Sequence, residues 1–489
     1  MHKRILKYTC IGGILVSQSV FAATTVLEDF SGSINLSKFN EIERSIELVN
    51  EKLIMSAKSS SYSKQGKSNS LLLDDNSITM LQAELSVTEL ILGNAETQQA
   101  VLRVAGEFYN ANSPSATTYL GDVFTIVALG DRGNGPEAWY EIQVSTSDDF
   151  STTNMTQGSL GTIELHNSYT VSITYDGGQG FSFGFNGAAV NVAGPARLGE
   201  AYEQVKLVGT RVRFGQNNST LDSLNDESPD NGSSATIVGT IDNVTTNNGL
   251  VDSFSGSSID QTIWDKKEFS KIIENGKLKL IAKSTTSDRA RTSFNISNQD
   301  VNFLGAKVTL SSDSTQAIGG QNRARIYSYW YNDTYDVNDS GNGLEGNIWA
   351  RSTIRRKADG SVVCLIGAER VEDAVHNTYT DIVPYEEYET CDLDTQYDLS
   401  IEKTDTSLVF KKDGVIIKTH IITTPMYPAK QDTSKTLRAE TRDAAGETVA
   451  FFDDITTDYL PPALTLVAKN ARVFRILCQV SGLNIEHVI

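Results

Sequence analysis

An internal repeat is the feature of this chain that most constrains its fold. Residues 27–33, Leu-Glu-Asp-Phe-Ser-Gly-Ser, resemble residues 251–257, Val-Asp-Ser-Phe-Ser-Gly-Ser. Further pairs of similar segments follow in the same order: 53–59 with 278–284, 103–110 with 325–332, 169–173 with 397–401, and 241–246 with 452–457. Ordered matches indicate a duplication, and the separation between them far exceeds the period of about 20–50 residues of a solenoid repeat. The chain therefore contains two copies of a whole domain.

The two ends of the chain do not belong to the repeat. Lys3 and Arg4 precede a short apolar run, and Ala22 occupies the position before a cleavage site, which is the pattern of a signal peptide. We therefore expect a secreted protein, periplasmic or extracellular. The expected divisions are a signal peptide at 1–22, a first domain at 23–247, a second domain at 248–459 and a C-terminal tail at 460–489.

The apolar residues of both copies recur with a period of two, which is the period of a half-buried strand. Asn186-Gly187 and Asp413-Gly414 lie between such runs, and Asn-Gly and Asp-Gly favour tight hairpin turns. Many short strands with few helical patterns indicate a sandwich or barrel. We predict an all-β protein of two tandem antiparallel β-sandwich (jelly-roll) domains.

The charge of the chain limits its partners. The formal net charge is −19, and such a surface repels phosphates and anionic lipids. We expect no nucleic-acid partner and no membrane span, whereas a divalent cation or a neutral glycan is compatible with this charge. In an oxidising compartment Cys364 and Cys391 are expected to form a disulfide; two reduced, buried thiols are the alternative.

The repeated segments resemble the concanavalin A-like lectin/glucanase superfamily, which includes laminin-G-like modules. The resemblance rests on an acidic-Phe-Ser-Gly opening, a late Tyr-x-x-x-Ile strand, an Asp/Asn-Gly hairpin and a closing strand with Asp. It implies a jelly roll in each copy and a structural Ca²⁺ held by the closing aspartates, Asp242 and Asp453. An aspartate that only faces water at the strand edge is the alternative.

The glucanases of this superfamily place two carboxylates on one strand, in a Glu-x-Asp-x-Glu motif, for a retaining mechanism. The chain has no such motif, and its five histidines match no triad or zinc site. We therefore expect a non-catalytic protein. A polysaccharide lyase or hydrolase with an atypical site, and a structural or adhesive surface protein, stay open as alternatives.

Alternating polar residues in the second copy form the candidate glycan site. Arg323, Arg325, Tyr327, Tyr329 and Tyr331 are expected on one face of a strand, and Arg438, Glu440 and Arg442 on one face of another. Aromatic rings stack on sugars, and arginine donates paired hydrogen bonds, so a polysaccharide or glycoconjugate is the expected partner. The alternative is that the tyrosines fill the core. The first copy has Ala105 and Glu107 at two of these positions, which favours a site in the second copy.

Overall fold

The computed structural model describes most of the chain: residues 25–31, 43–59, 67–73, 77–92, 99–213, 235–256, 258–266, 268–296, 301–334, 344–373, 378–429, 435–458, 479–480 and 483–484. The predicted signal peptide at 1–22 lies outside these residues, as does nearly all of the tail at 460–489. In that tail only the two short strands β30 (Gln479–Val480) and β31 (Leu483–Asn484) are described, and they pair with each other. None of the described residues forms a helix that is long and apolar enough to cross a membrane.

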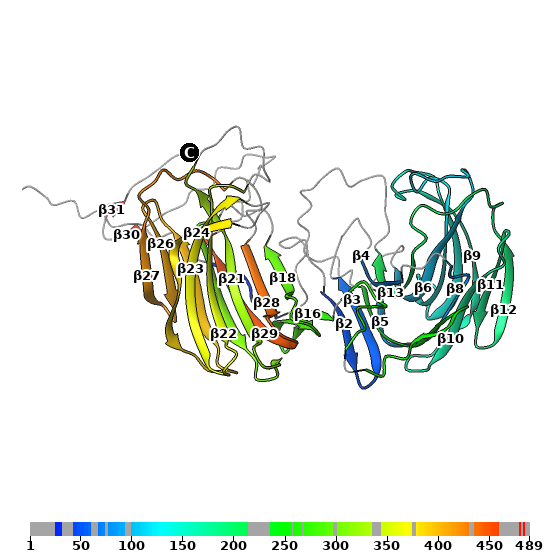
Figure 1. The fold of residues 1–489 in the computed structure, drawn as a ribbon, viewed down its shortest axis with the longest axis horizontal. Helices are drawn as coiled ribbons and strands as arrows, with labels where there is room; N and C mark the ends of the chain where they lie inside the picture. Colours follow the sequence, from blue (N-terminus) through cyan, green and yellow to red (C-terminus); the bar gives the residue numbers. More distant parts are fainter. Residues whose placement is uncertain are drawn as a thin grey trace, which may run out of the picture.

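One antiparallel sheet runs through both halves of the molecule (Figure 1). In the first half its strands follow the spatial order β12 (Ala188–Ala193), β11 (Gly180–Phe185), β10 (Tyr169–Tyr175), β5 (Met80–Leu92), β14 (Ala235–Thr246), β3 (Lys52–Ser59) and β2 (Glu43–Val49). In the second half they follow the order β16 (Phe269–Glu274), β17 (Lys277–Ser284), β29 (Gly446–Thr457), β19 (Phe303–Leu310), β25 (Tyr397–Lys403), β26 (Ser407–Lys412) and β27 (Val415–Ile421), and β20 (Thr315–Gln316) also pairs with β29.

A second sheet of six strands packs on each half of the continuous sheet. In the first sandwich its order is β4 (Lys67–Leu73), β13 (Lys206–Arg213), β6 (Gln99–Asn110), β7 (Asp122–Asp131), β8 (Glu137–Ser145) and β9 (Thr153–Thr162). In the second sandwich it is β18 (Ala290–Ile296), β28 (Lys435–Arg442), β21 (Gln321–Asn332), β22 (Asn347–Arg356), β23 (Val362–Asp373) and β24 (Thr378–Thr390). The predicted fold class, two tandem antiparallel β-sandwich domains, is confirmed.

Each sandwich buries its own apolar core between its two sheets. Alternate residues of β21, β22 and β28 point into the second core, including Ala324, Ile326, Ile354 and Leu437. The residues between them must therefore point to the opposite side of the sheet, because successive side chains of a strand alternate. This alternation creates the surface on which the candidate site lies.

The opening strands of the two sequence repeats pack on each other's sandwich. The strand β1 (Thr25–Glu28), from the N-terminal repeat, pairs with β29 in the second sandwich. The strand β15 (Gly249–Asp252), which opens the second repeat, pairs with β14 in the first sandwich. A short turn at 247–248 joins β14 to β15, so β15 folds back onto the strand that precedes it.

The two opening segments have the same local structure although they lie in different cores. The backbone N–H of Phe30 donates to the Glu28 carboxylate, and that of Phe254 donates to Asp252. Both phenylalanines have a positive φ, 51° at Phe30 and 50° at Phe254. Phe30 packs against Phe294 in the second core, whereas Phe254 packs against a tryptophan in the first.

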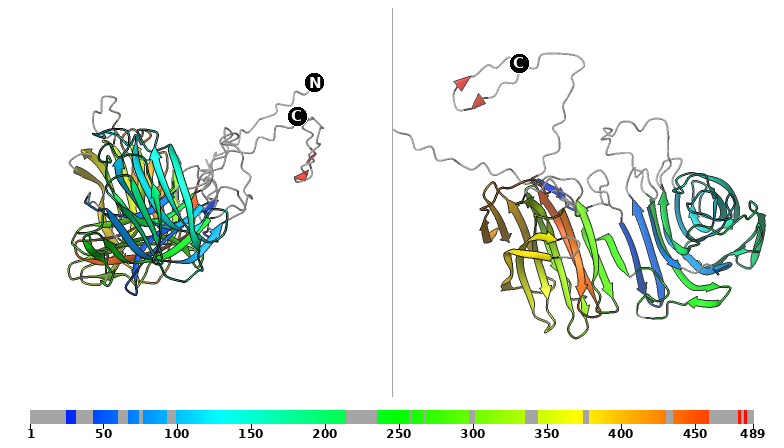
Figure 2. Two further views of the ribbon diagram at one scale, coloured as in Figure 1. Left: turned by 90° about the vertical axis from the view of Figure 1, so that its right-hand side faces the viewer. Right: turned by 45° about the horizontal axis from the view of Figure 1, so that its top comes forward.

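The boundary drawn from the sequence at 247/248 therefore separates the two repeats but not the two packed cores. Residues 25–31, assigned to the first domain, lie on the second sandwich, and residues 249–256 and 258–264, assigned to the second domain, complete the first. The physical reason is the tight turn after β14, which gives β15 the sheet edge nearest to it. A further antiparallel pair, β2 with β16, joins the two sandwiches through the register Phe269↔Ile46. This pair lies near the centre of Figure 1, and the two sandwiches lie on either side of it there and in the right-hand view of Figure 2.

Candidate functional site

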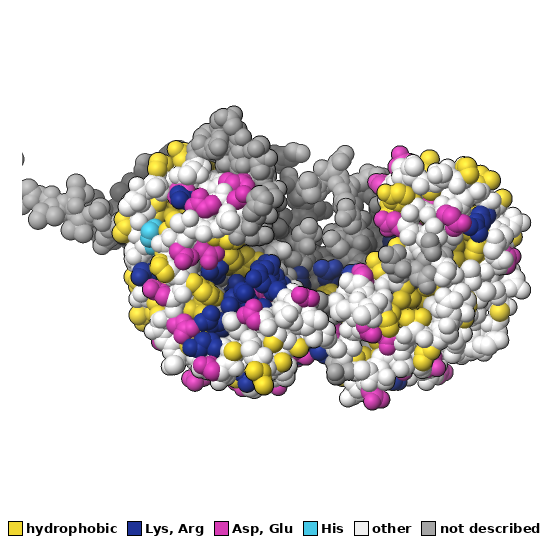
Figure 3. Space-filling model, viewed as in Figure 1, with side chains coloured by type: hydrophobic (Ala, Val, Ile, Leu, Met, Phe, Trp, Pro, Cys, Tyr) yellow, Lys and Arg dark blue, Asp and Glu magenta, His cyan; other side chains and the backbone are white. Residues whose placement is uncertain are grey.

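Four neighbouring strands of the second sandwich, β18, β28, β21 and β22, present one side away from the core. We call this side the basic face. Its arginines are Arg291, Arg323, Arg325, Arg351, Arg355, Arg438 and Arg442. The only carboxylate that these four strands contain is Glu440. Figure 3 shows Lys and Arg side chains gathered over these strands, in the hollowed middle of the left-hand sandwich. Carboxylates of neighbouring segments pair with three of these arginines: Glu369 with Arg351, Glu387 with Arg355, and Asp443 with Arg442. The remaining four arginines share only Glu440 on these strands, so the face stays cationic in a chain whose formal net charge is −19.

Glu440 lies at the centre of one arginine cluster and is 1% exposed. Arg325 Nη2 donates a hydrogen bond of 2.8 Å to Glu440 Oε1. Arg323, Arg291 and Arg289 approach the same carboxylate at 3.7, 3.5 and 3.9 Å. One carboxylate therefore serves four guanidinium groups, and this cluster keeps a net positive charge.

Like charges also face each other across the strands. Arg325 lies opposite Arg438, and Arg323 lies opposite Arg355. Such pairs destabilise a sheet. Burial, together with the charges of Arg325 and Arg291, lowers the pKa of Arg438 to about 9. Burial lowers the pKa of Arg323 to about 10. A cost of this kind, concentrated on one face, is typical of a functional site.

Aromatic rings border the arginines. The Arg438 guanidinium lies 4.3 Å from the centroid of the Tyr327 ring, and its Nε donates to the Ser293 hydroxyl at 2.8 Å. Trp349 meets Tyr327 edge to face at 5.6 Å, and the Arg351 guanidinium lies 4.5 Å from Trp349. Rings and guanidinium groups thus alternate along the face, and sugar rings and anionic groups can be bound side by side there.

Tyr385 reaches over the basic face from the edge strand β24. Its ring centroid lies 4.1 Å from the Arg351 guanidinium, and 5.7 and 5.8 Å from those of Arg355 and Arg323. Gly367 makes this possible, because a Cβ at that position would lie 2.8 Å from the Tyr385 ring. The pairing of β23 with β24 is irregular at this point, and the irregularity turns the edge strand toward the face.

Several buried polar atoms of this region have no hydrogen-bond partner among the described residues. They are Nε of Arg323, Arg325, Arg351 and Arg355, Nε1 of Trp349 and the Tyr385 hydroxyl. Each unpaired buried donor costs about 1–3 kcal/mol, so a native protein keeps few of them. Their convergence on one surface indicates that the surface is built to bind hydrogen-bond acceptors.

The structure places seven of the eight sequence-predicted glycan-site residues on the basic face, with Tyr329 half-buried opposite Trp349. Tyr331 is the exception, since it is 2% exposed and belongs to the apolar core. A β-bulge between Tyr329 and Tyr331 shifts the register and reverses the direction of the side chains that follow. Burial and the nearby Asp333 raise the pKa of Tyr331 to about 12, as expected for a core tyrosine.

The sequence prediction missed five residues of the site, and one of them, Arg291, belongs to β18. Trp349, Arg351 and Arg355 come from β22, where an alternation of aromatic and basic residues was available as a signal. Tyr385 had no comparable signal, because it reaches the face only through an irregular strand pairing and a neighbouring glycine.

The corresponding face of the first sandwich is built around an apolar cluster and carries both positive and negative side chains, among them Arg103 and Glu141. Its residues form a buried cluster of Val101, Ala105, Ile126, Ala128, Trp139 and Leu207. Arg103, which matches Arg325 in the repeat, is retained there and is 5% exposed. Glu107, which matches Tyr329, is also buried, and burial together with neighbouring carboxylates raises its pKa to about 7. The excess of arginines over carboxylates is therefore a feature of the second sandwich.

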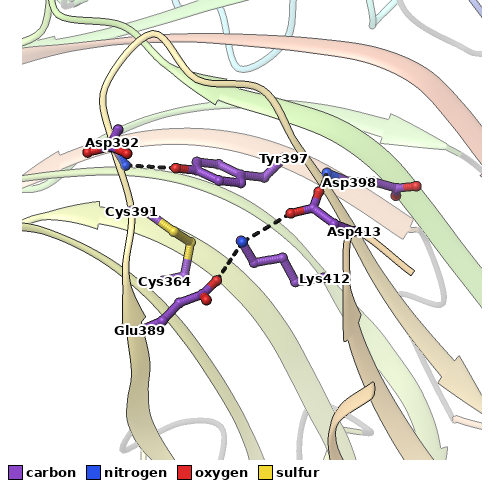
Figure 4. The surroundings of a disulfide bond; sticks show 8 residues. All are labelled: Cys364, Glu389, Cys391, Asp392, Tyr397, Asp398, Lys412 and Asp413. Carbon is purple, nitrogen blue, oxygen red and sulfur yellow. Dashed lines mark hydrogen bonds and ion pairs between the residues drawn. A yellow bond between two sulfur atoms is a disulfide. The ribbon is translucent and has the colours of Figure 1, made fainter. Parts of the chain in front are cut away.

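A disulfide links the edge strand β24, which carries Tyr385, to the neighbouring strand β23. Cys364 of β23 bonds to Cys391, directly after β24, with the Cα atoms 5.6 Å apart (Figure 4). Lys412 lies beside the disulfide, and its Nζ is 2.6 Å from a Glu389 carboxylate oxygen and 4.4 Å from the ring of Tyr397. The expected Cys364–Cys391 disulfide is thus present. Cys364, Cys391 and Glu389 also lie within metal-binding distance, but the two sulfur atoms are already bonded to each other.

The two aspartates that the resemblance assigned to Ca²⁺ close matching β-bulges. Asp242 accepts a hydrogen bond from the Asn243 backbone, and Asp453 accepts one from the Asp454 backbone, each at 2.8 Å. Burial raises the pKa of Asp242, and the carboxylate of Glu84 on the neighbouring strand adds to this effect. In the described part of the chain, neither aspartate belongs to a cluster of three ligating side chains.

Comparisons with known proteins show only remote likenesses. No protein-family model matches the chain, and no curated protein matches it. Three similar solved structures are an alginate lyase mutant in complex with alginate tetrasaccharide, the κ-carrageenase from Pseudoalteromonas carrageenovora with an oligotetrasaccharide of κ-carrageenan, and the catalytic domain of an endo-1,3-β-glucanase (laminarinase) from Thermotoga petrophila RKU-1.

The identities to these three proteins are 12%, 13% and 10%. The matches cover 39%, 38% and 40% of this chain, and 83%, 80% and 81% of the other chains. The TM-scores are 0.25, 0.23 and 0.26, which are too low to indicate an activity or a ligand for this chain.

Proposed function

We propose that this protein is a secreted, non-catalytic carbohydrate-binding protein whose basic face binds an anionic polysaccharide. The observation that carries the proposal is the excess of arginines over carboxylates on four adjacent strands of an acidic chain. Carboxylate and sulfate groups accept paired hydrogen bonds from guanidinium groups, and the rings of Tyr327 and Trp349 offer stacking surfaces for sugars. The sequence analysis allowed a neutral glycan; the charge of this face favours an anionic one.

The surrounding acidic surface adds selectivity to this proposal. A negative surface repels polyanions, so an anionic chain is attracted only where the local potential is positive. The fixed positions of the buried arginines, held from both sides by neighbouring strands, reduce the entropy lost on binding. We also propose that the two sandwiches are duplicated members of the concanavalin A-like superfamily, which the sequence resemblance and the matching strand orders support.

A polysaccharide lyase is the second candidate, and Tyr385 is the observation that favours it. Its hydroxyl is buried without a hydrogen-bond partner in the described residues, beside three guanidinium groups. A tyrosine hydroxyl can take part in proton transfer as a general acid or base. A lyase site needs such a base next to cations that neutralise the uronate carboxylate.

One experiment separates these functions. Mature wild-type protein and the Tyr329→Ala variant are titrated with polygalacturonate, chondroitin sulfate and neutral laminarin while the products are analysed. Binding of an anionic chain without new chain ends, weakened by Tyr329→Ala, is the expected result. Unsaturated products would make the protein a lyase, and the absence of binding to all three would favour a structural or adhesive role. Repeating the titration after chelation with EDTA tests the proposed structural Ca²⁺.

A further inference from the structure

A cavity of about 420 Å³ lies at the junction of the two sandwiches, next to the basic face. Its lining includes five cationic residues: Arg44, Lys266, Lys271, Arg289 and Arg291. Arg44 belongs to β2 of the first sandwich, whereas Arg289 and Arg291 belong to the second and also approach Glu440 of the basic face. The cavity and the basic face are therefore continuous through these two arginines, and Figure 3 shows Lys and Arg side chains extending from that face toward the junction.

The carboxylates of the cavity are already engaged. Glu268 is 6% exposed; it accepts hydrogen bonds from the backbone of Leu48 and Ile259 and lies 2.8 Å from Lys283 Nζ. Asp265 accepts a hydrogen bond of 2.7 Å from the Leu72 backbone. Asp265 also lies 3.9 Å from Lys266 Nζ, and the five cations of the lining outnumber its two carboxylates.

Two cations face each other at the pairing that joins the sandwiches. Arg44 of β2 lies opposite Lys271 of β16, and Lys271 is 4% exposed. Like charges directly opposite each other destabilise a strand pair. The Arg44 Nε is buried and has no hydrogen-bond partner among the described residues. An anionic group in the cavity would accept this hydrogen bond and offset the repulsion.

We propose that this junction cavity is a second anion subsite, and that a polyanionic chain bound on the basic face extends into it and is held there by Arg44. The inference rests on the proposed function, because the same polysaccharide occupies both places. From β18 to β22 the face spans three strand spacings, about 14 Å, so a short oligomer can occupy the face without reaching the junction. The subsite places cations of both sandwiches around one chain, since Arg44 belongs to the first sandwich and Arg291 to the second.

The test uses the full mature chain and oligomers of increasing length from polygalacturonate and from chondroitin sulfate. Arg44→Gln is expected to weaken binding of the long oligomers about tenfold and to leave the shortest ones unchanged. Lys52→Gln is the matched control, since it removes the same charge from the same sandwich about 17 Å along the β2–β3 hairpin. Arg44→Lys, which keeps the charge, is expected to restore part of the affinity.

The outcomes distinguish the two proposals. If the wild type binds neither polyanion, the proposed function fails and the junction subsite fails with it. If binding is lost in Arg438→Gln but Arg44→Gln matches the wild type at every length, only the junction subsite is refuted. Unfolding curves show whether Arg44→Gln perturbs folding; if it does, Lys266→Gln replaces it, because that side chain lines the cavity and is 41% exposed. Competition by inorganic sulfate against the long oligomers alone would also support the subsite.

Discussion

Because each opening strand packs on the sandwich of the other repeat, a substitution near the N-terminus should destabilise the second sandwich and not the first. Phe30 lies near the N-terminus but is fully buried in the core of the second sandwich, 5.9 Å from the ring of Phe294. Phe30→Ala removes a buried aromatic ring, so it should destabilise that sandwich by about 4 kcal/mol. Phe254→Ala, the matched change in the other repeat, should destabilise the first sandwich to a similar extent, because Phe254 is 2% exposed beside Trp264.

Hydrogen exchange of peptides from β6 and β21 reports the two sandwiches separately. A loss of about 4 kcal/mol corresponds to an increase of about a thousandfold in the opening equilibrium. Phe30→Ala should therefore raise exchange in β21 and spare β6, and Phe254→Ala should do the opposite. Faster exchange of β6 in Phe30→Ala, with β21 unchanged, would refute the strand exchange and restore the simple domain boundary at 247/248.

Three further predictions concern single features. The Cys364–Cys391 disulfide closes a loop with a sequence separation of 27, so its reduction should lower the free energy of unfolding by about 3.5 kcal/mol. The unfolding midpoint should fall when reductant is added, and an unchanged midpoint would contradict this prediction. Burial raises the pKa of Glu107 to about 7. Its contribution to the free energy of unfolding, about 3 kcal/mol, is therefore complete below its ordinary pKa near 4.5 and is lost as the pH rises through 7. Glu107→Gln should flatten this pH dependence of unfolding of the first sandwich, and an unaltered profile would argue against it. Gly367→Ala should displace Tyr385 and weaken polygalacturonate binding several-fold in calorimetry, and full affinity would show that Tyr385 does not contact the ligand.

The sequence predicted the local pattern of the fold well, because strand alternation and turn residues are local properties. It could not assign β1 and β15 to sandwiches, since both segments have nearly the same residues and either sheet edge accepts them. The assignment depends on the length of the turn after β14, which leaves only one edge within reach of β15. Which strand an opening strand pairs with thus depends on the three-dimensional arrangement of the chain and not on its local sequence.

The candidate site was predictable where the strands are regular. Arg323, Arg325 and Tyr327 alternate in the sequence and share one face in the structure. Tyr331 was assigned wrongly because strict alternation was carried through a bulge that the sequence does not reveal. Tyr385 was not predicted because the irregular pairing of β23 with β24, which brings it over the face, also has no signal in the sequence.

Arg438 offers the most direct test of the central claim, that the basic face binds a polyanion. Its contacts with Ser293 and Tyr327 are to neutral groups, and it faces Arg325 across the strands. Arg438→Gln should therefore weaken binding of polygalacturonate about tenfold while the unfolding midpoint stays equal or rises, because a repulsion is removed. Wild-type binding should also weaken as salt is added. Unchanged affinity in Arg438→Gln, or equal wild-type binding of neutral laminarin, would contradict the account.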